Sequence, residues 1–147
     1  MGWVVHRHCF LYALEYGWNW RFEALVARIA AEFVENFQPE KELCRIAELD
    51  GEIVGSVFLV QVDDTTAKLR LLYVEPKARG FGFGTRLVEE CIEFGRKAGY
   101  QKISLWTNSV LVDARKLYLK MGFNLIFSES YQDFGQALVS ETWELDL

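Results

Sequence analysis

The sequence predicts a single mixed α/β domain across residues 1–147, and three observations predict that class. Between residues 20 and 37, apolar side chains recur at steps of three and four, as on one face of a helix. Two β-rich runs then flank Asp50-Gly51, a dipeptide suited to a tight type I′ hairpin turn. A third strand-like run ends at Pro76 and leads through a glycine-rich junction into another helix. This alternation is typical of helices packed on a sheet.

The elements are expected in the order strand, helix, three strands, helix, strand, helix and two strands. A first strand is expected around His6 and His8, and Asn19 can cap the first helix. The later expected elements are a helix from about Thr85 to Ala98, a strand at 102–107, a helix at 110–121, a strand at 123–128 and a last strand at 141–147. Residues 129–138 show no clear periodicity and are expected to form a loop.

The composition is that of an ordered globular protein, because 51% of the 147 residues are hydrophobic, 25% are charged and only two are proline. No apolar run is long enough to cross a bilayer, and the first ten residues lack the apolar core of a secretory signal. The three cysteines share no CxxC spacing, which predicts neither a disulfide framework nor a zinc ribbon. We therefore expect a soluble cytoplasmic protein without a membrane partner.

Charge is unevenly distributed along the chain. The net charge of −5 argues against general nucleic-acid binding, so no direct nucleic-acid partner is expected. Residues 77–120 nevertheless carry nine Lys and Arg against four acidic residues, whereas the rest of the chain is acidic. This basic segment indicates either a local anionic ligand or solvated helix faces.

Three glycines, Gly80, Gly82 and Gly84, stand between the third strand and the next helix. Glycine costs backbone entropy and contributes no packing, so this cluster indicates a need for bare backbone. The spacing fails the dinucleotide fingerprint, because no glycine occupies its sixth position, and the Gly-Lys-Ser/Thr of a P-loop is absent. The remaining interpretation is an anion nest, in which amides from about Phe81 to Thr85 converge at a helix N-terminus. A pyrophosphate fits such a nest.

Arg79 precedes the nest, where its guanidinium offers planar, charge-assisted donors to phosphate oxygens. Arg79, Gly82 and Gly84 match the R/Q-x-x-G-x-G/A signature of the GNAT superfamily of acetyl-CoA-dependent N-acetyltransferases. The chain resembles this superfamily over about residues 22–127.

A second element carries the same resemblance. The run Ala114-x-x-x-Tyr118-x-x-x-Gly122-Phe123 is similar to the later A-x-x-x-Y-x-x-x-G-F element of the superfamily. The resemblance implies a GNAT-like fold, with a mixed, mostly antiparallel central sheet of six to seven strands flanked by helices. It also implies transfer of an acetyl group from acetyl-CoA to a primary amine acceptor, without a metal.

Two other functions stay open. The chain is similar more narrowly to the GNAT half of bacterial proteins that carry a MarR-type DNA-binding half, which would suit a non-catalytic acyl-CoA-sensing module linked to transcriptional regulation. A simple nucleotide-binding domain is the other alternative. The identity of the amine and the formation of a homodimer are left open by the sequence.

The residues expected to bind acetyl-CoA come from the strand end, the glycine loop and one later strand. Leu72 and Val74 would pair with the pantetheine amides like a neighbouring strand, and an N–H near Tyr73 or Val74 would polarise the thioester carbonyl. Phe81 and Phe83 are expected to anchor the loop in apolar surface. The full expected set is Leu72, Tyr73, Val74, Arg79, Gly80, Phe81, Gly82, Phe83, Gly84, Thr85 and Asn108. Thr85 could instead cap the helix.

Tyr118 and Glu75 are the candidate catalytic residues. Periodicity alone places Tyr118 on an apolar helix face as a core residue, whereas the resemblance implies that its phenol protonates the departing thiolate of CoA. Glu75, at the end of the central strand, is the first candidate for the base that deprotonates the amine, and Glu48 and Asp50 are others. An exposed carboxylate without a catalytic role is an equally good interpretation of Glu75.

Other polar and aromatic residues complete the expectations. On a strand His6 and His8 would share a face beside Cys9, but the sequence has no further His, and no metal site is expected. Cys91 lies on an apolar helix face and is expected in the core. The acceptor is expected beside the first helix and the 129–138 segment, with walls formed by Trp18, Trp20, Tyr131 and Phe134.

Overall fold

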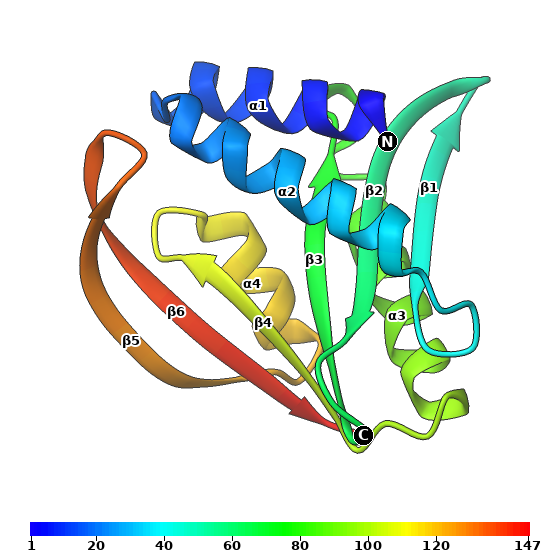
Figure 1. The fold of residues 1–147 in the computed structure, drawn as a ribbon. Coiled ribbons are helices and arrows are strands. Elements are labelled where there is room, and N and C mark those ends of the chain that lie inside the picture. Colours follow the sequence, from blue (N-terminus) through cyan, green and yellow to red (C-terminus); the bar gives the residue numbers. More distant parts are fainter.

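The computed structural model describes all 147 residues (Figure 1). Its helices are α1 (Gly2–Tyr16), α2 (Trp20–Asn36), α3 (Phe83–Lys97) and α4 (Val112–Lys120), with a short 3₁₀ turn at Pro76–Ala78. Its strands are β1 (Leu43–Leu49), β2 (Glu52–Gln61), β3 (Thr66–Val74), β4 (Lys102–Asn108), β5 (Asn124–Asp133) and β6 (Gln136–Asp146). No helix is long and apolar enough to span a membrane.

The six strands form one sheet in the order β1-β2-β3-β4-β6-β5, and every neighbouring pair is antiparallel except β3 with β4. Helices α1 and α2 cross one face of the sheet, and α3 and α4 lie against the other (Figure 1). The predicted class, a mixed and mostly antiparallel sheet flanked by helices, is confirmed.

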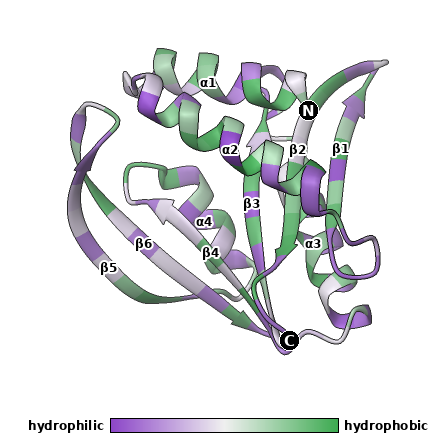
Figure 2. Cartoon of the chain, in the orientation of Figure 1, coloured by the Kyte–Doolittle hydropathy of each residue, from purple (hydrophilic) through white to green (hydrophobic).

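Successive side chains of β2 point to opposite faces of the sheet and pack into the core on each face. Val57 and Leu59 join the core beneath α3 and α4, whereas Phe58 packs with Val4 and Phe33 beneath α1 and α2. Strand β2 is buried on both faces and is apolar along most of its length (Figure 2). Strand β5, at the sheet edge, is largely exposed. Strand β2 therefore contributes to the core on both faces of the sheet.

Strands β3 and β4 pair over only part of their length. The parallel register covers Thr66 to Leu69 opposite Lys102 to Leu105, and beyond that point the strands diverge (Figure 1). Leu71 has a φ of 49°, and the β2–β3 register shifts beside it, which marks a β-bulge. The last residues of β3 therefore have a free edge on the side facing β4.

Two expectations about secondary structure were correct in detail. Asn19 Oδ1 accepts a hydrogen bond from the Arg21 amide at 3.1 Å, which caps α2. Asp50 and Gly51 take φ values of 52° and 80° between β1 and β2, as a type I′ turn requires. Local turn and cap chemistry decided both features.

The expected first strand around His6 and His8 is wrong, because residues 2–16 form helix α1. The buried residues of α1 are Val4, His8 and Leu11, which lie at steps of four and three. The helical period was present in the sequence, and the alternate histidines obscured it.

The expected loop at 129–138 is also wrong. Strand β5 continues to Asp133, and Phe134 and Gly135, with φ of 56° and 83°, turn the chain directly into β6. Phenylalanine rarely adopts this left-handed conformation, so Gly135 was the only sequence signal of the turn. Here the ring of Phe134 is buried against α2 residues, and this packing stabilises the turn.

Candidate active site

A cavity of about 510 Å³ opens between α1, the end of β3 and the N-terminal turn of α3. It is called the donor cavity below. Its walls include Leu72, Tyr73 and Val74 from β3 and Leu117 from α4. The loop that precedes α3 lines it with Arg79, Gly80, Gly82, Phe83, Gly84 and Thr85. The structure thus brings together nine of the residues expected to bind acetyl-CoA.

The glycine loop presents unpaired amides to this cavity. The first amide of the region that donates to a backbone carbonyl is that of Arg86, which bonds Gly82 O at 3.1 Å. The amides from Gly80 to Thr85 have no such acceptor, as expected at a helix N-terminus. Free amides and the positive end of the α3 dipole form a site for an anion.

Backbone conformation, not space, requires Gly80 and Gly82. Their φ values are 83° and 82°, and a Cβ at either position would meet no atom within 4 Å. Gly84 differs, because its Cβ would lie 3.3 Å from Leu117 on α4, so it permits close packing of the two helices. Backbone conformation therefore explains glycine at positions 80 and 82, and helix packing explains it at position 84.

Arg79 stands at the cavity mouth and forms an ion pair with Glu15 of α1, with 3.1 Å between Nη2 and Oε1. Lys120 adds a second positive charge to the lining and donates to Thr85 Oγ1 at 3.4 Å. Thr85 lies within the first turn of α3, and Gly82 occupies the cap position. The cavity lining thus carries two cations that can meet a phosphate, Arg79 and Lys120, and two carboxylates, Glu15 and Asp113, of which Glu15 pairs with Arg79.

Tyr118 is buried, with 5% of its surface exposed, and its ring packs against Phe123 and Trp143. Burial raises the pKa of its phenol above the ordinary value, so the group stays protonated. Ala114 and Leu117, one turn and one residue before it, line the donor cavity. Tyr118 therefore lies directly behind the cavity wall, in the core.

Tyr12 of α1 lines the donor cavity itself. Burial first, and the neighbouring phenol of Tyr118 next, raise the pKa of Tyr12. Tyr12 was not among the expected site residues, because the only element expected before residue 20 was a strand around His6 and His8. It is a second phenol that could supply a proton at the same site.

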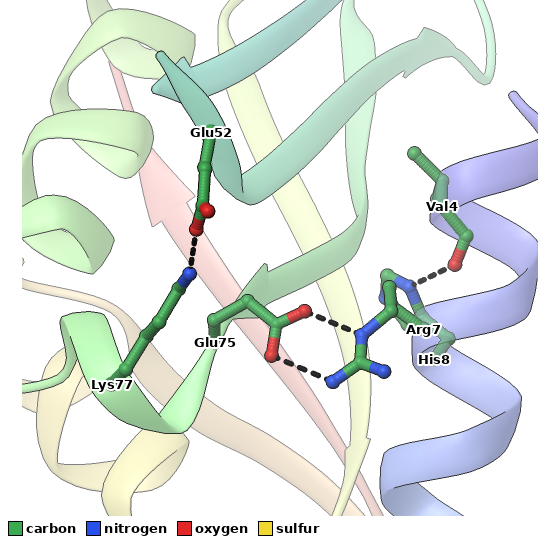
Figure 3. A network of polar contacts seen from close by, with 6 residues as sticks. All are labelled: Val4, Arg7, His8, Glu52, Glu75 and Lys77. Atoms are coloured by element: carbon green, nitrogen blue, oxygen red, sulfur yellow. Dashed lines mark hydrogen bonds and ion pairs between the residues drawn. The ribbon is translucent and has the colours of Figure 1, made fainter. Parts of the chain in front are cut away.

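Glu75 is buried at the end of β3 and is held by Arg7 of α1 (Figure 3). The Arg7 Nη2 donates to Glu75 Oε2 at 2.9 Å, and Nε donates to the other oxygen. Although burial acts to raise it, the hydrogen bond and charge of Arg7 hold the pKa of Glu75 below its usual range. Glu75 does not line the donor cavity, so its role as base stays a prediction.

Besides Tyr118 and Glu75, four more expected residues lie outside the donor cavity. Phe81 is 72% exposed, so the expectation that it anchors the loop in apolar surface is wrong. Asn108 is buried, and its Oδ1 accepts a hydrogen bond from the Tyr131 hydroxyl at 2.6 Å. Glu48 and Asp50 are exposed at the β1–β2 hairpin.

The histidines do not form a cluster. On helix α1 the side chain of His6 is exposed, whereas His8 is buried and bonds Val4 O through Nδ1 at 2.9 Å (Figure 3). No group of three or more His, Cys, Asp or Glu in the structure could hold a metal ion. Cys91 is buried in the core beneath α3, as expected.

The sequence profile of the Acetyltransferase (GNAT) family matches residues 6–123. The chain belongs to this GNAT family. Among curated relatives, human N-acetyltransferase 8 is 31% identical over 99 residues, which make up 63% of this chain and 44% of that protein. Human N-acetyltransferase 8B is 34% identical over 83 residues, 53% of this chain and 37% of that protein. The GNAT chain thus spans less than half the length of these relatives.

Solved structures share the GNAT fold. An acetyltransferase from Streptococcus agalactiae has a TM-score of 0.72 at 22% identity and covers 97% of this chain and 87% of its own. A GNAT family acetyltransferase from Elizabethkingia anophelis, solved with acetyl-CoA bound, has a TM-score of 0.67 at 18% identity over 82% of each chain. The comparisons give no support for the narrower resemblance to MarR-type fusion proteins.

A second cavity of the GNAT chain, of about 480 Å³, lies between α2, β3, Trp106 of β4 and the β5–β6 hairpin. Tyr131 and Phe134, expected as walls of an acceptor site, both line it. Trp18 lies in the core cluster beneath α2, and Trp20 is 79% exposed beside a different hollow. Two of the four expected acceptor residues therefore share one cavity.

Proposed function

We propose that this GNAT chain transfers an acetyl group from acetyl-CoA directly to the nitrogen of a primary amine. The observation that carries the proposal is the run of free amides from Gly80 to Thr85, set beside the free edge of β3 in one cavity. This arrangement suits the two ends of CoA, which are a charged diphosphate and an amide-bearing pantetheine arm. The acetyl-CoA bound to the Elizabethkingia anophelis neighbour supports this ligand.

The diphosphate would bind the loop amides and Arg79, because charge-assisted bonds from a guanidinium add to the field of the helix N-terminus. Leu72 and Val74 would pair with the pantetheine amides through the β3 edge that β4 leaves open. An N–H near Tyr73 or Val74 would then polarise the thioester carbonyl. The backbone thus supplies most of the binding and the positioning.

In the transfer, the amine nitrogen forms a bond to the acetyl carbon while the carbon–sulfur bond of the thioester breaks. The amine loses one proton, and the CoA thiolate gains one. Tyr118 is proposed as the proton donor to the thiolate, because burial keeps its phenol protonated behind the cavity wall. Much of the rate would come from holding amine and thioester together.

The test is free-thiol release from acetyl-CoA over a panel of small amines, amino acids and peptides, with Arg79→Ala alongside wild type. Amine-dependent thiol release that falls in the variant at low acetyl-CoA supports the proposal. Tight CoA binding without amine-dependent release across the panel would overturn the transferase and favour the acyl-CoA sensor. Comparable affinity for ATP, NAD and CoA would favour a simple nucleotide-binding domain.

A further inference from the structure

The second cavity adjoins the donor cavity at the bulge of β3. Leu71, the bulged residue, lines the second cavity, and the next residue, Leu72, lines the donor cavity. The two cavities therefore meet at adjacent residues of β3, the strand along which the thioester is proposed to lie. On the proposed function, the second cavity is the place of the acceptor.

The lining of this cavity is strongly cationic. It contains four basic side chains, Arg21, Arg28, Lys68 and Arg70, and a single carboxylate, Asp133. Asp133 is engaged by Arg21, which donates to both of its oxygens. The other three cations form no ion pair, so the cavity has positive charge without a partner.

Lys68 and Arg70 are two residues apart on β3 and point to the same face of the sheet. Burial, and then the charge of Arg70, lower the pKa of Lys68. Burial also lowers the pKa of Arg70, and Glu32, the one carboxylate that opposes this effect, lies beyond ion-pair distance. Two partly desolvated cations side by side are unfavourable unless an anion joins them.

Arg70 also has an orphaned donor. Its Nε is buried and has no hydrogen-bond acceptor in the structure. Buried donors are nearly always satisfied in folded proteins, so this nitrogen marks Arg70, a residue of the cavity wall, as a cation without a partner. The remaining wall is apolar and aromatic, with Trp106 and Tyr131 in an edge-to-face contact at 5.9 Å.

We propose that the acceptor is a small amine that also carries an anionic group, which Arg70 binds while Lys68 and Arg28 add positive charge. Its amine would lie at the Leu71–Leu72 bulge, and its body would pack on Trp106 and Tyr131. On acetylation the amine nitrogen bonds the acetyl carbon and releases its proton, the thioester carbon–sulfur bond breaks, and the anionic group is unchanged. An amino acid carboxylate and an aminoalkyl phosphate present the same chemistry to these cations.

The experiment uses related amines with and without an anionic group. L-Phenylalanine, L-phenylalaninamide and 2-phenylethylamine form the carboxylate arm, and phosphoethanolamine and ethanolamine form the phosphate arm. Calorimetric binding to the full chain saturated with CoA is measured first, and acetyl transfer second. We expect the member of one arm that carries the anionic group to bind at least about tenfold more tightly than its counterparts without that group.

Arg70→Gln should remove this preference, while Arg70→Lys should retain part of it because it keeps the charge. Arg96→Gln, an exposed arginine on α3, is the matched control and should change nothing. Thermal unfolding of each variant checks the fold, and Lys68→Gln repeats the test if Arg70→Gln does not fold.

The two proposals fail in different ways. Equal binding and equal acetylation of amines with and without the anionic group would overturn the anionic acceptor and leave the acetyltransferase intact. A preference for the anionic amine that Arg70→Gln leaves unchanged would also overturn it. Anion binding that depends on Arg70 without acetyl transfer to any amine would support this cavity as an anion site and contradict the proposed function.

Discussion

Glu15 of α1 and Arg79 of the glycine loop form an ion pair across the mouth of the donor cavity, with 3.1 Å between Oε1 and Nη2. The pair joins a helix near the N-terminus to the residue that is proposed to bind the diphosphate. Glu15 therefore holds Arg79 in position and also competes with an incoming anion.

Glu15→Gln is expected to tighten CoA binding about two- to fivefold, because an exposed pair of this kind is worth at most about 1 kcal/mol. Calorimetric titration at low and at high salt measures the effect, which should shrink at high salt because the competition is electrostatic. Weaker binding in the variant would show that Glu15 serves mainly to position Arg79.

Gly82→Ala should weaken CoA binding, because a side chain at φ 82° strains the loop that presents the amides. Gly51→Ala is a matched control, since Gly51 has a φ of 80° and equally open surroundings in a hairpin outside the donor cavity. Both changes should cost about 1–2 kcal/mol of unfolding free energy. Only Gly82→Ala should reduce CoA affinity, and an equal loss in both variants would contradict the role of the loop.

Tyr118→Phe should lower kcat about 100-fold with an unchanged Kd for CoA, because it removes the proposed proton donor and little else. Tyr12→Phe is its partner experiment, since Tyr12 lines the donor cavity near the same phenol. Steady-state rates with saturating acetyl-CoA separate the two. Full activity in Tyr118→Phe with a large loss in Tyr12→Phe would show that Tyr12, and not Tyr118, is the general acid.

Arg7→Ala should destabilise the fold by about 2–4 kcal/mol, because it leaves the buried carboxylate of Glu75 without its partner. The double change Arg7→Ala with Glu75→Gln should recover part of this loss. Chemical denaturation of the three proteins measures the coupling. A neutral Arg7→Ala would show that the pair does not hold α1 to the sheet.

Acid stability follows from the same pair. The folded-state pKa of Glu75 is lowered, so the unfolded state binds the proton more readily. Its contribution to stability is present at neutral pH and is lost as the pH falls below about 4. Glu75→Gln should therefore lose less stability than wild type between pH 6 and pH 3, and a parallel decline in both proteins would contradict the assignment. If Glu75 were the catalytic base, the same variant would also lose activity at neutral pH.

The elements predicted from sequence were those with local causes. The Asp50-Gly51 turn was predicted correctly because positive φ angles leave a direct mark on residue choice. Helix α1 was missed although Val4, His8 and Leu11 follow a helical period, because alternate histidines also suggest a strand. The left-handed Phe134 carried no local signal, since its cause is packing against α2.

The site was predictable only where it is contiguous in sequence. Six of the seven residues from Arg79 to Thr85, which are contiguous in sequence, line one cavity in the structure. Arg7 and Glu75 are separated by 68 positions, and nothing in the sequence around either residue indicates that the two form a pair. The cationic cavity likewise combines Arg28 of α2 with Lys68 and Arg70 of β3, and only the fold brings them together.

The most direct test of the account is a titration of the isotope-labelled chain with CoA, followed by the amide resonances of Gly80, Gly82 and Gly84. The account predicts saturable binding in which these amides show the largest shifts, since they would donate to the diphosphate. Saturable binding with the largest shifts elsewhere, or no binding at millimolar CoA, would contradict it.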